Sequence, residues 1–404
     1  MRHIYQALIV CALCFSVSPA QAVEVEKVVS AKGITAWLVR DSANPITSIR
    51  FSFRGGSSLD PAGKQGLATF AASVMDEGAG DLDSQAFQKE LEDLSVSLRF
   101  DTGLDGFNGR LRTLNKHRDR AAELMRLALS SPRFDKEPTE RVRAQLISGL
   151  RQSEQDPNTL ASRAMFKTMF PAHPYAQPSG GSIEGISKID AADLKMFVAA
   201  RLARDNLTVG VVGDISKAEL GQLLDRIFGG LPAKATAGTV TKTMPTTKAG
   251  VRIVDLAVPQ SSIQWAQPGL LRSDPDFYAA YVLNYVLGGG GFVSRLYSEV
   301  REKRGLAYSV YSYLMPLDRA GAWVGGAATA NARVSETLET VKAVWARMAA
   351  EGPTADELKN AKTYLTGSFP LRFTSSDRIA GMLVGMQEDK LGIDYIDRRN
   401  SYIE

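Results

Sequence analysis

The two halves of this chain repeat one order of predicted secondary structure, and this repeat constrains the fold most. In the first half, a predicted strand and loop lead through Leu59-Asp60-Pro61 to an apolar helix around Phe70-Ala71-Ala72. In the second half, strands predicted over residues 251–257 and 262–266 and a loop lead through Ser273-Asp274-Pro275 to a helix around Tyr278-Ala279-Ala280. The chain has 404 residues and is 44% hydrophobic, which is enough for two cores. The repeat therefore predicts two homologous α+β domains.

Residues 233–250 are the predicted linker, because they are rich in Thr, Ala, Lys and Gly and lack apolar periodicity. The N-terminal domain is expected over residues 23–232 and the C-terminal domain over residues 251–404. Each domain should hold a mixed or antiparallel sheet packed against several helices. The strand and helix predicted over residues 206–228 close the first domain, and the second domain shows no counterpart. The chain is therefore expected to be truncated or naturally short.

The first 22 residues have the layout of a secretory signal peptide. A short positive start, Met1-Arg2-His3, precedes an apolar run over residues 7–17 and the small-x-small sequence Ala20-Gln21-Ala22. This layout predicts a soluble periplasmic protein, and no other segment is long and apolar enough to span a membrane. Cys11 and Cys14 both lie in the signal, so the mature chain has no thiol or disulfide. The net charge of +4 is too small to indicate nucleic-acid binding.

The mature chain is poor in metal-binding side chains, because His117 and His173 are its only histidines. Neither histidine has an acidic residue at ligand spacing. His117, in a basic helix start, is expected on the surface, and the Pro-flanked His173 is expected to have a structural role in a loop. No nucleophile motif is present, and the glycine loop Gly288–Gly291 lacks the Lys-Ser/Thr pair of a phosphate-binding loop. The sequence therefore predicts no metal and no catalytic residue on this chain.

Arg301 and Tyr308 are the candidate binding residues. Arg301 lies in the last turn of a helix predicted over residues 292–303, with Gly305 as its stop, and Tyr308 lies near the start of a strand that begins near Ala307. This helix-to-strand turn can bring the two side chains together. A guanidinium and a phenol both donate hydrogen bonds, so the pair could hold a peptide carbonyl or an oxyanion. The alternative reading is a cation near a helix end and a core tyrosine.

Residues 301–308, Arg-Glu-Lys-Arg-Gly-Leu-Ala-Tyr, resemble the pitrilysin/insulinase family of zinc metallopeptidases, in particular its bacterial branch similar to mitochondrial processing peptidase. The segment from Arg54 to Ala68 resembles the lead-in to the family's zinc motif, and the likeness covers nearly all of the mature chain. In this family, an Arg and a Tyr seven residues apart bind substrate opposite the zinc. The resemblance implies this role for Arg301 and Tyr308.

The chain departs from the family where the zinc motif should stand. The family sequence His-x-x-Glu-His supplies two zinc ligands and the general base. Thr69 and Ser73 replace the two histidines here, and Ala72 replaces the base. The third ligand is expected near Ser148-Gly149, and neither residue has a carboxylate. The changes at Thr69, Ala72, Ser73 and Gly149 therefore imply a chain that has lost its metal site.

The resemblance then implies a non-catalytic partner in a heterodimeric peptidase. A homologous zinc-bearing subunit would supply zinc and base, and this chain would bind an unfolded peptide substrate with Arg301 and Tyr308. The chain alone is expected to be inactive. The alternative is a non-proteolytic structural or peptide-binding protein of the same fold, similar to core subunits of respiratory complexes.

Overall fold

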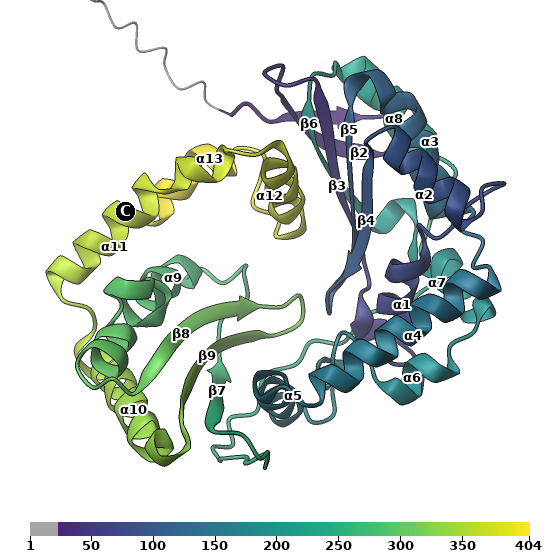
Figure 1. Ribbon diagram of the computed structural model, residues 1–404. Helices are drawn as coiled ribbons and strands as arrows, with labels where there is room; N and C mark the ends of the chain where they lie inside the picture. Colours follow the sequence, from purple (N-terminus) through teal and green to yellow (C-terminus); the bar gives the residue numbers. More distant parts are fainter. Residues whose placement is uncertain (1–22) are drawn as a thin grey trace, which may run out of the picture.

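The computed structural model describes residues 23–404 as two lobes of sheet and helix joined by an extended segment (Figure 1). The predicted signal peptide, residues 1–22, lies outside the described residues. In the N-terminal lobe, six strands form a mixed sheet in the order β1-β2-β6-β3-β5-β4. The strands are β1 (Glu26–Val29), β2 (Thr35–Arg40), β3 (Ile46–Arg54), β4 (Ser97–Thr102), β5 (Gly106–Leu114) and β6 (Leu207–Gly213).

The helices of the N-terminal lobe pack mainly on one face of this sheet. They are α1 (Leu67–Val74), α2 (Ser84–Asp93), α3 (Arg118–Ser130), α4 (Lys136–Ser153), α5 (Pro157–Met169), α6 (Ile183–Lys188), α7 (Ala191–Arg201) and α8 (Lys217–Phe228). Alternation along β3 directs Ile49, Phe51 and Phe53 into the core below these helices, and all three are at most 1% exposed. The apolar alternation that predicted the strand therefore also supplies its core face.

The C-terminal lobe has a three-stranded antiparallel sheet in the order β7-β9-β8. Its elements are β7 (Gln260–Pro268), α9 (Phe277–Asn284), β8 (Ala307–Pro316), β9 (Gly321–Ala330), α10 (Val334–Glu351), α11 (Ala355–Gly367), α12 (Ser376–Glu388) and α13 (Tyr395–Arg398). Both lobes thus combine a mixed or antiparallel sheet with helices, which confirms the predicted α+β class. Within residues 23–404, no helix is both long and apolar enough to cross a bilayer.

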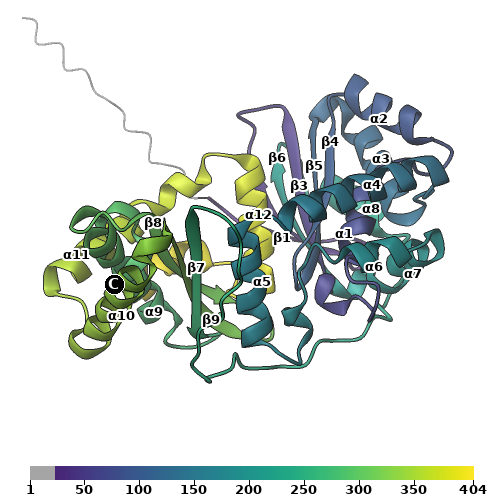
Figure 2. The same ribbon diagram turned by 60° about the horizontal axis from the view of Figure 1, so that its bottom comes forward.

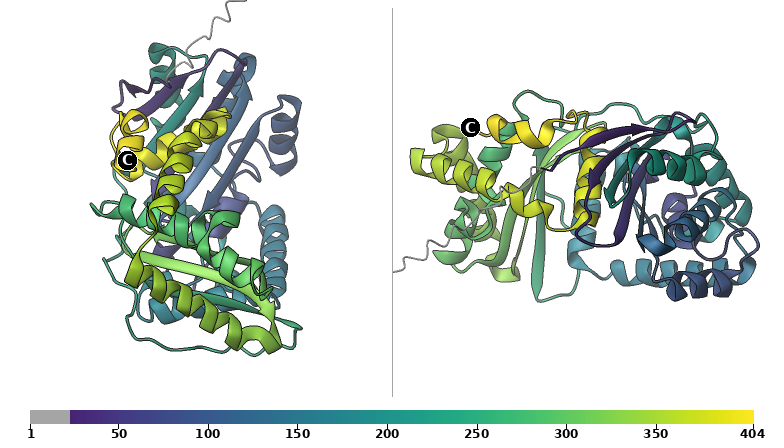
Figure 3. Two further views of the ribbon diagram at one scale, coloured as in Figure 1. Left: turned by 90° about the vertical axis from the view of Figure 1, so that its left-hand side faces the viewer. Right: turned by 90° about the horizontal axis from the view of Figure 1, so that it is seen from above.

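Each lobe sends one helix onto the sheet of the other lobe (Figures 2 and 3). Helix α12 packs on β6, β3 and β2 of the N-terminal lobe, and α5 packs on β7 of the C-terminal lobe. Arg50 of β3 also forms an ion pair with Asp377 at the start of α12, with Nε 2.7 Å from a carboxylate oxygen. Helix α12 therefore covers the second face of the N-terminal sheet, although it begins more than a hundred residues after the last strand of that sheet.

Gly210 of β6 makes the close approach of α12 possible. A Cβ atom there would lie 2.3 Å from the Ala380 carbonyl oxygen and 2.9 Å from Leu383 Cβ. We expect Gly210→Val to weaken the docking of α12 and to destabilise the protein by about 1–3 kcal/mol, as overpacking does. Hydrogen exchange of residues 376–388 should speed up. Thr208→Val, in the same strand, is the control, and unchanged exchange in Gly210→Val would contradict this account.

The strand predicted over residues 251–257 is not formed. Residues 239–258 contain no helix or strand, and Val251 and Ile253 are 77% and 83% exposed. In the N-terminal lobe, β2 pairs with β6, and β1 pairs with β2. The described part of the C-terminal lobe has no counterpart of β6. A β-branched segment has no ladder to join without such a neighbour, so its propensity alone does not make it a strand.

Candidate functional site

The first part of the site is the start of α1, where the family motif would stand. Gly66 precedes the helix with a φ of +102°, which favours glycine. The Asp60 carboxylate accepts hydrogen bonds from the backbone N–H groups of Gly66 and Ala68, at 2.9 and 3.1 Å. Helix α1 packs against α4. The fold therefore still brings together the two helices that would carry the metal ligands.

The side chains at these positions have no metal-binding groups. The Thr69 hydroxyl donates to the Ser179 carbonyl oxygen, and the Ser73 hydroxyl donates to the Thr69 carbonyl oxygen, both at 2.8 Å. Ala72 is 5% exposed, and the Cβ position of Gly149 has no neighbour within 4 Å. Across residues 23–404, no group of three or more His, Cys, Asp or Glu is placed to hold a metal. The residues present do not fit the zinc that the family resemblance implies.

His173 has a structural role. Its Nδ1 accepts a hydrogen bond from the backbone N–H of Tyr175 at 3.2 Å, and its Nε2 lies 2.9 Å from the Thr241 carbonyl oxygen. Both ring nitrogens therefore form hydrogen bonds, and the bond to Thr241 holds the segment between the two lobes against the N-terminal lobe. His117, directly before α3, is partly exposed and its side chain does not cap the helix.

The second part of the site is the Arg301/Tyr308 pair in the C-terminal lobe. The predicted helix over residues 292–303 is wrong in type, because residues Gly291–Val293 form a 3-10 turn and Tyr297–Glu302 form a π-helix. π-Helical turns are frequent at functional sites. Gly305 ends the segment with a φ of +58°, and β8 begins at Ala307 as expected.

The Arg301 guanidinium lies over two tyrosine rings. Its guanidinium carbon lies 4.5 Å from the ring centre of Tyr308 and 5.0 Å from that of Tyr297. Such cation–π contacts stabilise an arginine without using its N–H donors. Tyr308 is 80% exposed, so the alternative reading of a core tyrosine is wrong. Tyr297 was not predicted as a site residue. Its position four residues before Arg301 places both side chains on one face of a predicted helix, but it does not show that the ring contacts the guanidinium.

The Arg301 guanidinium has no hydrogen bond or ion pair with any residue in the described range 23–404. The neighbouring carboxylate, Glu299, is held instead by Lys303, Arg304 and Arg347, at 2.9, 2.6 and 3.1 Å. Hydrogen bonds from Arg304 and Lys303 lower the pKa of Glu299 to about 2. Arg301 therefore keeps its fork of N–H donors available beside an exposed phenol.

The Glu299 cluster should stabilise the segment that carries Arg301. A depressed folded-state pKa means that its contribution is complete above the ordinary pKa of 4.5 and is lost as pH falls toward about 2. We expect Glu299→Gln to cost about 1–2 kcal/mol at pH 7, after allowance for its exposed partners. This difference should fall by about half near pH 3. Urea unfolding against pH measures it, with the exposed Glu336→Gln as control, and a pH-independent difference would contradict the account.

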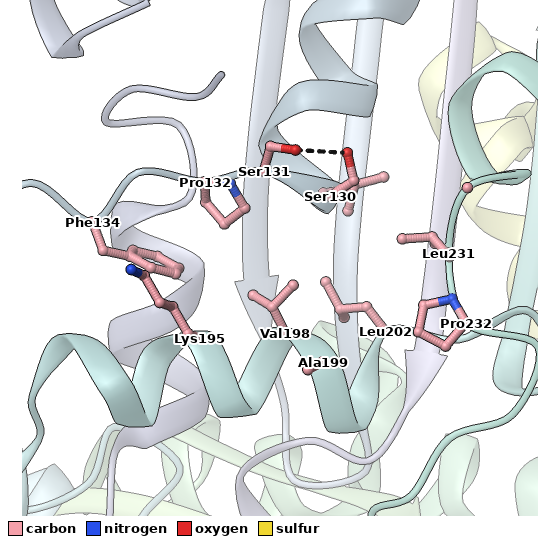
Figure 4. A pocket seen from close by; sticks show the side chains of 12 residues that line it. Ser130, Ser131, Pro132, Phe134, Lys195, Val198, Ala199, Leu202, Leu231 and Pro232 are labelled. Atoms are coloured by element: carbon pink, nitrogen blue, oxygen red, sulfur yellow. Dashed lines mark hydrogen bonds between the residues drawn. The ribbon is translucent and has the colours of Figure 1, made fainter. Parts of the chain in front are cut away.

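A concavity of about 390 Å³ lies elsewhere, at the outer side of the N-terminal lobe (Figure 4). Its walls come from the end of α3, from α7 and from the turn after α8, and they are mainly apolar with Lys195 at the rim. It contains none of the predicted site residues. Its lining residues are Leu129, Ser130, Ser131, Pro132, Phe134, Lys195, Val198, Ala199, Leu202, Gly230, Leu231 and Pro232.

The two lobes and the altered α1 motif define a peptidase-type fold that lacks metal-binding side chains at the usual positions. Residues 188–365 match the family model described as the peptidase M16 inactive domain. The chain is 31% identical to a Helicobacter pylori protein named non-peptidase homolog YmxG, over 81% of this chain and 76% of that protein. The chain therefore belongs to the M16 peptidase family, as an inactive member, and the resemblance seen in the sequence is confirmed.

Solved structures agree with this assignment. The structure of a peptidase M16 inactive domain from Pseudomonas fluorescens is similar with a TM-score of 0.87 and 31% identity, covering 94% of this chain and 90% of that one. A chain in the complex III2 structure of Candida albicans is similar with a TM-score of 0.75 and 16% identity, covering 94% of this chain and 89% of that one. The second likeness shows the fold alone.

Proposed function

We propose that this chain is the non-zinc-binding subunit of a heterodimeric periplasmic metallopeptidase, and that it binds peptide substrate with Arg301 and Tyr308. A homologous subunit supplies the zinc and the general base. The observation that carries the proposal is the available guanidinium of Arg301, which lies over the rings of Tyr297 and Tyr308. The signal-peptide pattern of residues 1–22 supports the periplasmic location.

The chemistry of the pair suits a peptide carbonyl. The planar guanidinium offers two N–H groups in fixed directions, and the Tyr308 phenol can add a third donor. Donors that are fixed before substrate arrives stabilise an oxygen that gains negative charge, because little reorganisation is needed. Stacking on two rings holds Arg301 in this way without an acidic partner.

Mixing the chain with a homologous subunit that has an intact His-x-x-Glu-His motif tests the proposal. We expect each chain alone to cleave an unfolded fluorogenic peptide slowly or not at all, and the mixture to cleave it at least about tenfold faster. Zinc analysis should find about one metal per zinc-bearing subunit and none on this chain. Equal rates for the mixture and the zinc-bearing subunit alone would overturn the proposal.

The second candidate is a non-proteolytic structural or peptide-binding protein, for which the similarity of fold to the complex III2 chain is the supporting observation. This role predicts peptide binding or complex formation without any gain in cleavage. A half-buried Arg301 without a polar partner among residues 23–404 is better explained by the peptidase proposal, since a scaffold needs no free donors beside an exposed phenol.

A further inference from the structure

Two more tyrosines lie exposed on β8, beyond Tyr308. Strand β8 is an edge strand of the described sheet, and its register is irregular between Ala307 and Val310. After this irregularity, Val310 and Ser312 are buried, whereas Tyr311 and Tyr313 are 37% and 46% exposed. The Tyr311 and Tyr313 rings lie nearly parallel, with centres 6.1 Å apart and an interplanar angle of 19°. We call these two rings the tyrosine platform.

The neighbouring strands hold the platform in place. Tyr311, Gly326 of β9 and Gln264 of β7 are in register across the sheet. A Cβ on Gly326 would lie only 2.7 Å from the Tyr311 hydroxyl oxygen, so glycine leaves room for the ring to lie across the strand. Gln264 Nε2 lies 2.6 Å from Asn158 Oδ1, at the start of α5. The platform therefore lies on the sheet face that α5 also contacts, the face toward the N-terminal lobe (Figure 1).

We infer that the tyrosine platform binds a bulky apolar side chain of the peptide held by Arg301 and Tyr308, and so selects peptides with an apolar residue near the bound carbonyl. This inference rests on the proposed function. Tyr308 and Tyr311 are three residues apart on one strand, which corresponds to about 10 Å of extended chain. A peptide running along β8 from the Arg301/Tyr308 pair would thus place a side chain about three residues away over the two rings.

The surroundings favour an apolar over a charged side chain. The hydrogen bonds beside the platform join neutral groups: Gln264 Nε2 lies 2.6 Å from Asn158 Oδ1 and 3.4 Å from the Tyr311 hydroxyl, and the Ser262 hydroxyl lies 3.2 Å from Asn158 Oδ1. Burial and the nearby Tyr311 raise the pKa of Tyr313, and no carboxylate or cation contributes to this shift. A lysine or an aspartate of the peptide would therefore lose hydration without gaining a countercharge. Aliphatic and aromatic side chains instead gain apolar contact with two flat rings that are partly shielded from water.

Binding of fluorescein-labelled peptides to the full chain, measured by anisotropy, tests the inference. The peptides are unstructured and identical except at one position, which is leucine, phenylalanine, lysine or aspartate. We expect the leucine and phenylalanine peptides to bind about tenfold more tightly than the other two. The double variant Tyr311→Ser/Tyr313→Ser should reduce this preference to about twofold or less. The single variant Tyr313→Ser should reduce it in part, which guards against misfolding of the double variant.

Two controls separate this inference from the proposed function. Tyr364→Ser removes another exposed, stacked tyrosine, whose ring centre lies 5.2 Å from that of Tyr285, and it should leave the preference intact. Arg301→Ala should weaken the binding of all four peptides by a similar factor and should also leave the preference intact. No preference in the wild type, tightest binding of the lysine peptide, or a preference that survives in both platform variants would overturn the inference. Loss of cleavage in the two-subunit mixture with an intact preference would count against the proposed function alone.

Discussion

Arg201→Ala is expected to lower the free energy of unfolding by about 3–5 kcal/mol, the cost of removing one partner from a buried ion pair. Arg201 is 4% exposed at the end of α7. Its guanidinium donates to the carbonyl oxygens of Gly56 and Leu59, at 2.8 and 2.7 Å, and to the Asp60 carboxylate at 3.1 Å. The truncation would take this donor from the Gly56 and Leu59 carbonyl oxygens, and it would leave the buried Asp60 carboxylate without its countercharge at the start of α1.

The pH dependence of this loss has a definite sign. Burial raises the pKa of Asp60 to about 6, although Arg201 and the N–H groups of Gly66 and Ala68 favour the carboxylate. Removal of Arg201 takes away a cation and should raise this pKa further. The folded variant then binds more protons than the unfolded chain, so it becomes more stable as pH falls from 8 to 5. Denaturant unfolding at pH 8 and pH 5 should show the smaller loss at pH 5.

Arg40→Ala is the matched control, because Arg40 is 53% exposed and pairs with Glu26 at the surface. It should cost less than about 1 kcal/mol at both pH values. A loss in Arg201→Ala that is as small as in this control would show that the ion pair does not stabilise the start of α1. A loss that grows from pH 8 to pH 5 would show that Asp60 remains ionised in the variant.

The sequence predicted most helices and strands, because apolar periodicity is local. It did not predict that α5 packs on the sheet of the C-terminal lobe or that α12 packs on the sheet of the N-terminal lobe. The apolar positions of α12, among them Ala380 and Leu383, identify a buried face but not the strand it meets, and Gly210 lies 170 residues before Ala380. The strand predicted over residues 251–257 failed for a related reason, since strand formation depends on a neighbour that local pattern does not reveal.

The candidate site was predictable to the extent that it depends on residue chemistry. Threonine, alanine, serine and glycine at positions 69, 72, 73 and 149 cannot replace imidazole and carboxylate groups, whatever the local geometry. The stacking of Arg301 was not predictable in the same way. Tyr297 meets Arg301 on a π-helical turn, whose backbone differs from the α-helix that periodicity suggests. Arg301 is available also because Glu299 pairs with Lys303, Arg304 and Arg347 and not with Arg301. The sequence does not show which of these nearby cations the carboxylate contacts.

Arg301→Ala should lower the peptidase activity of the two-subunit mixture by about 100-fold to 1,000-fold, the usual effect of losing a donor to a developing oxyanion. Arg301→Lys should restore little of this activity, because an ammonium lacks the planar fork and stacks less well between two rings. Tyr308→Phe keeps the ring against Arg301 and removes only the hydroxyl. We therefore expect a smaller loss, about tenfold.

The double variant Arg301→Ala/Tyr308→Phe shows whether both groups serve one oxygen atom. If they do, the two losses should not add, since removal of Arg301 already displaces the carbonyl from the phenol. Initial rates with the zinc-bearing subunit in excess provide the comparison, and size-exclusion chromatography checks that each variant still forms the complex. Arg126→Ala, which breaks a half-buried pair with Glu123 on α3, is the control and should retain wild-type rates. Wild-type rates for Arg301→Ala in an intact complex would refute the role of this residue, because a freely available guanidinium beside Tyr308 would then contribute nothing to the reaction.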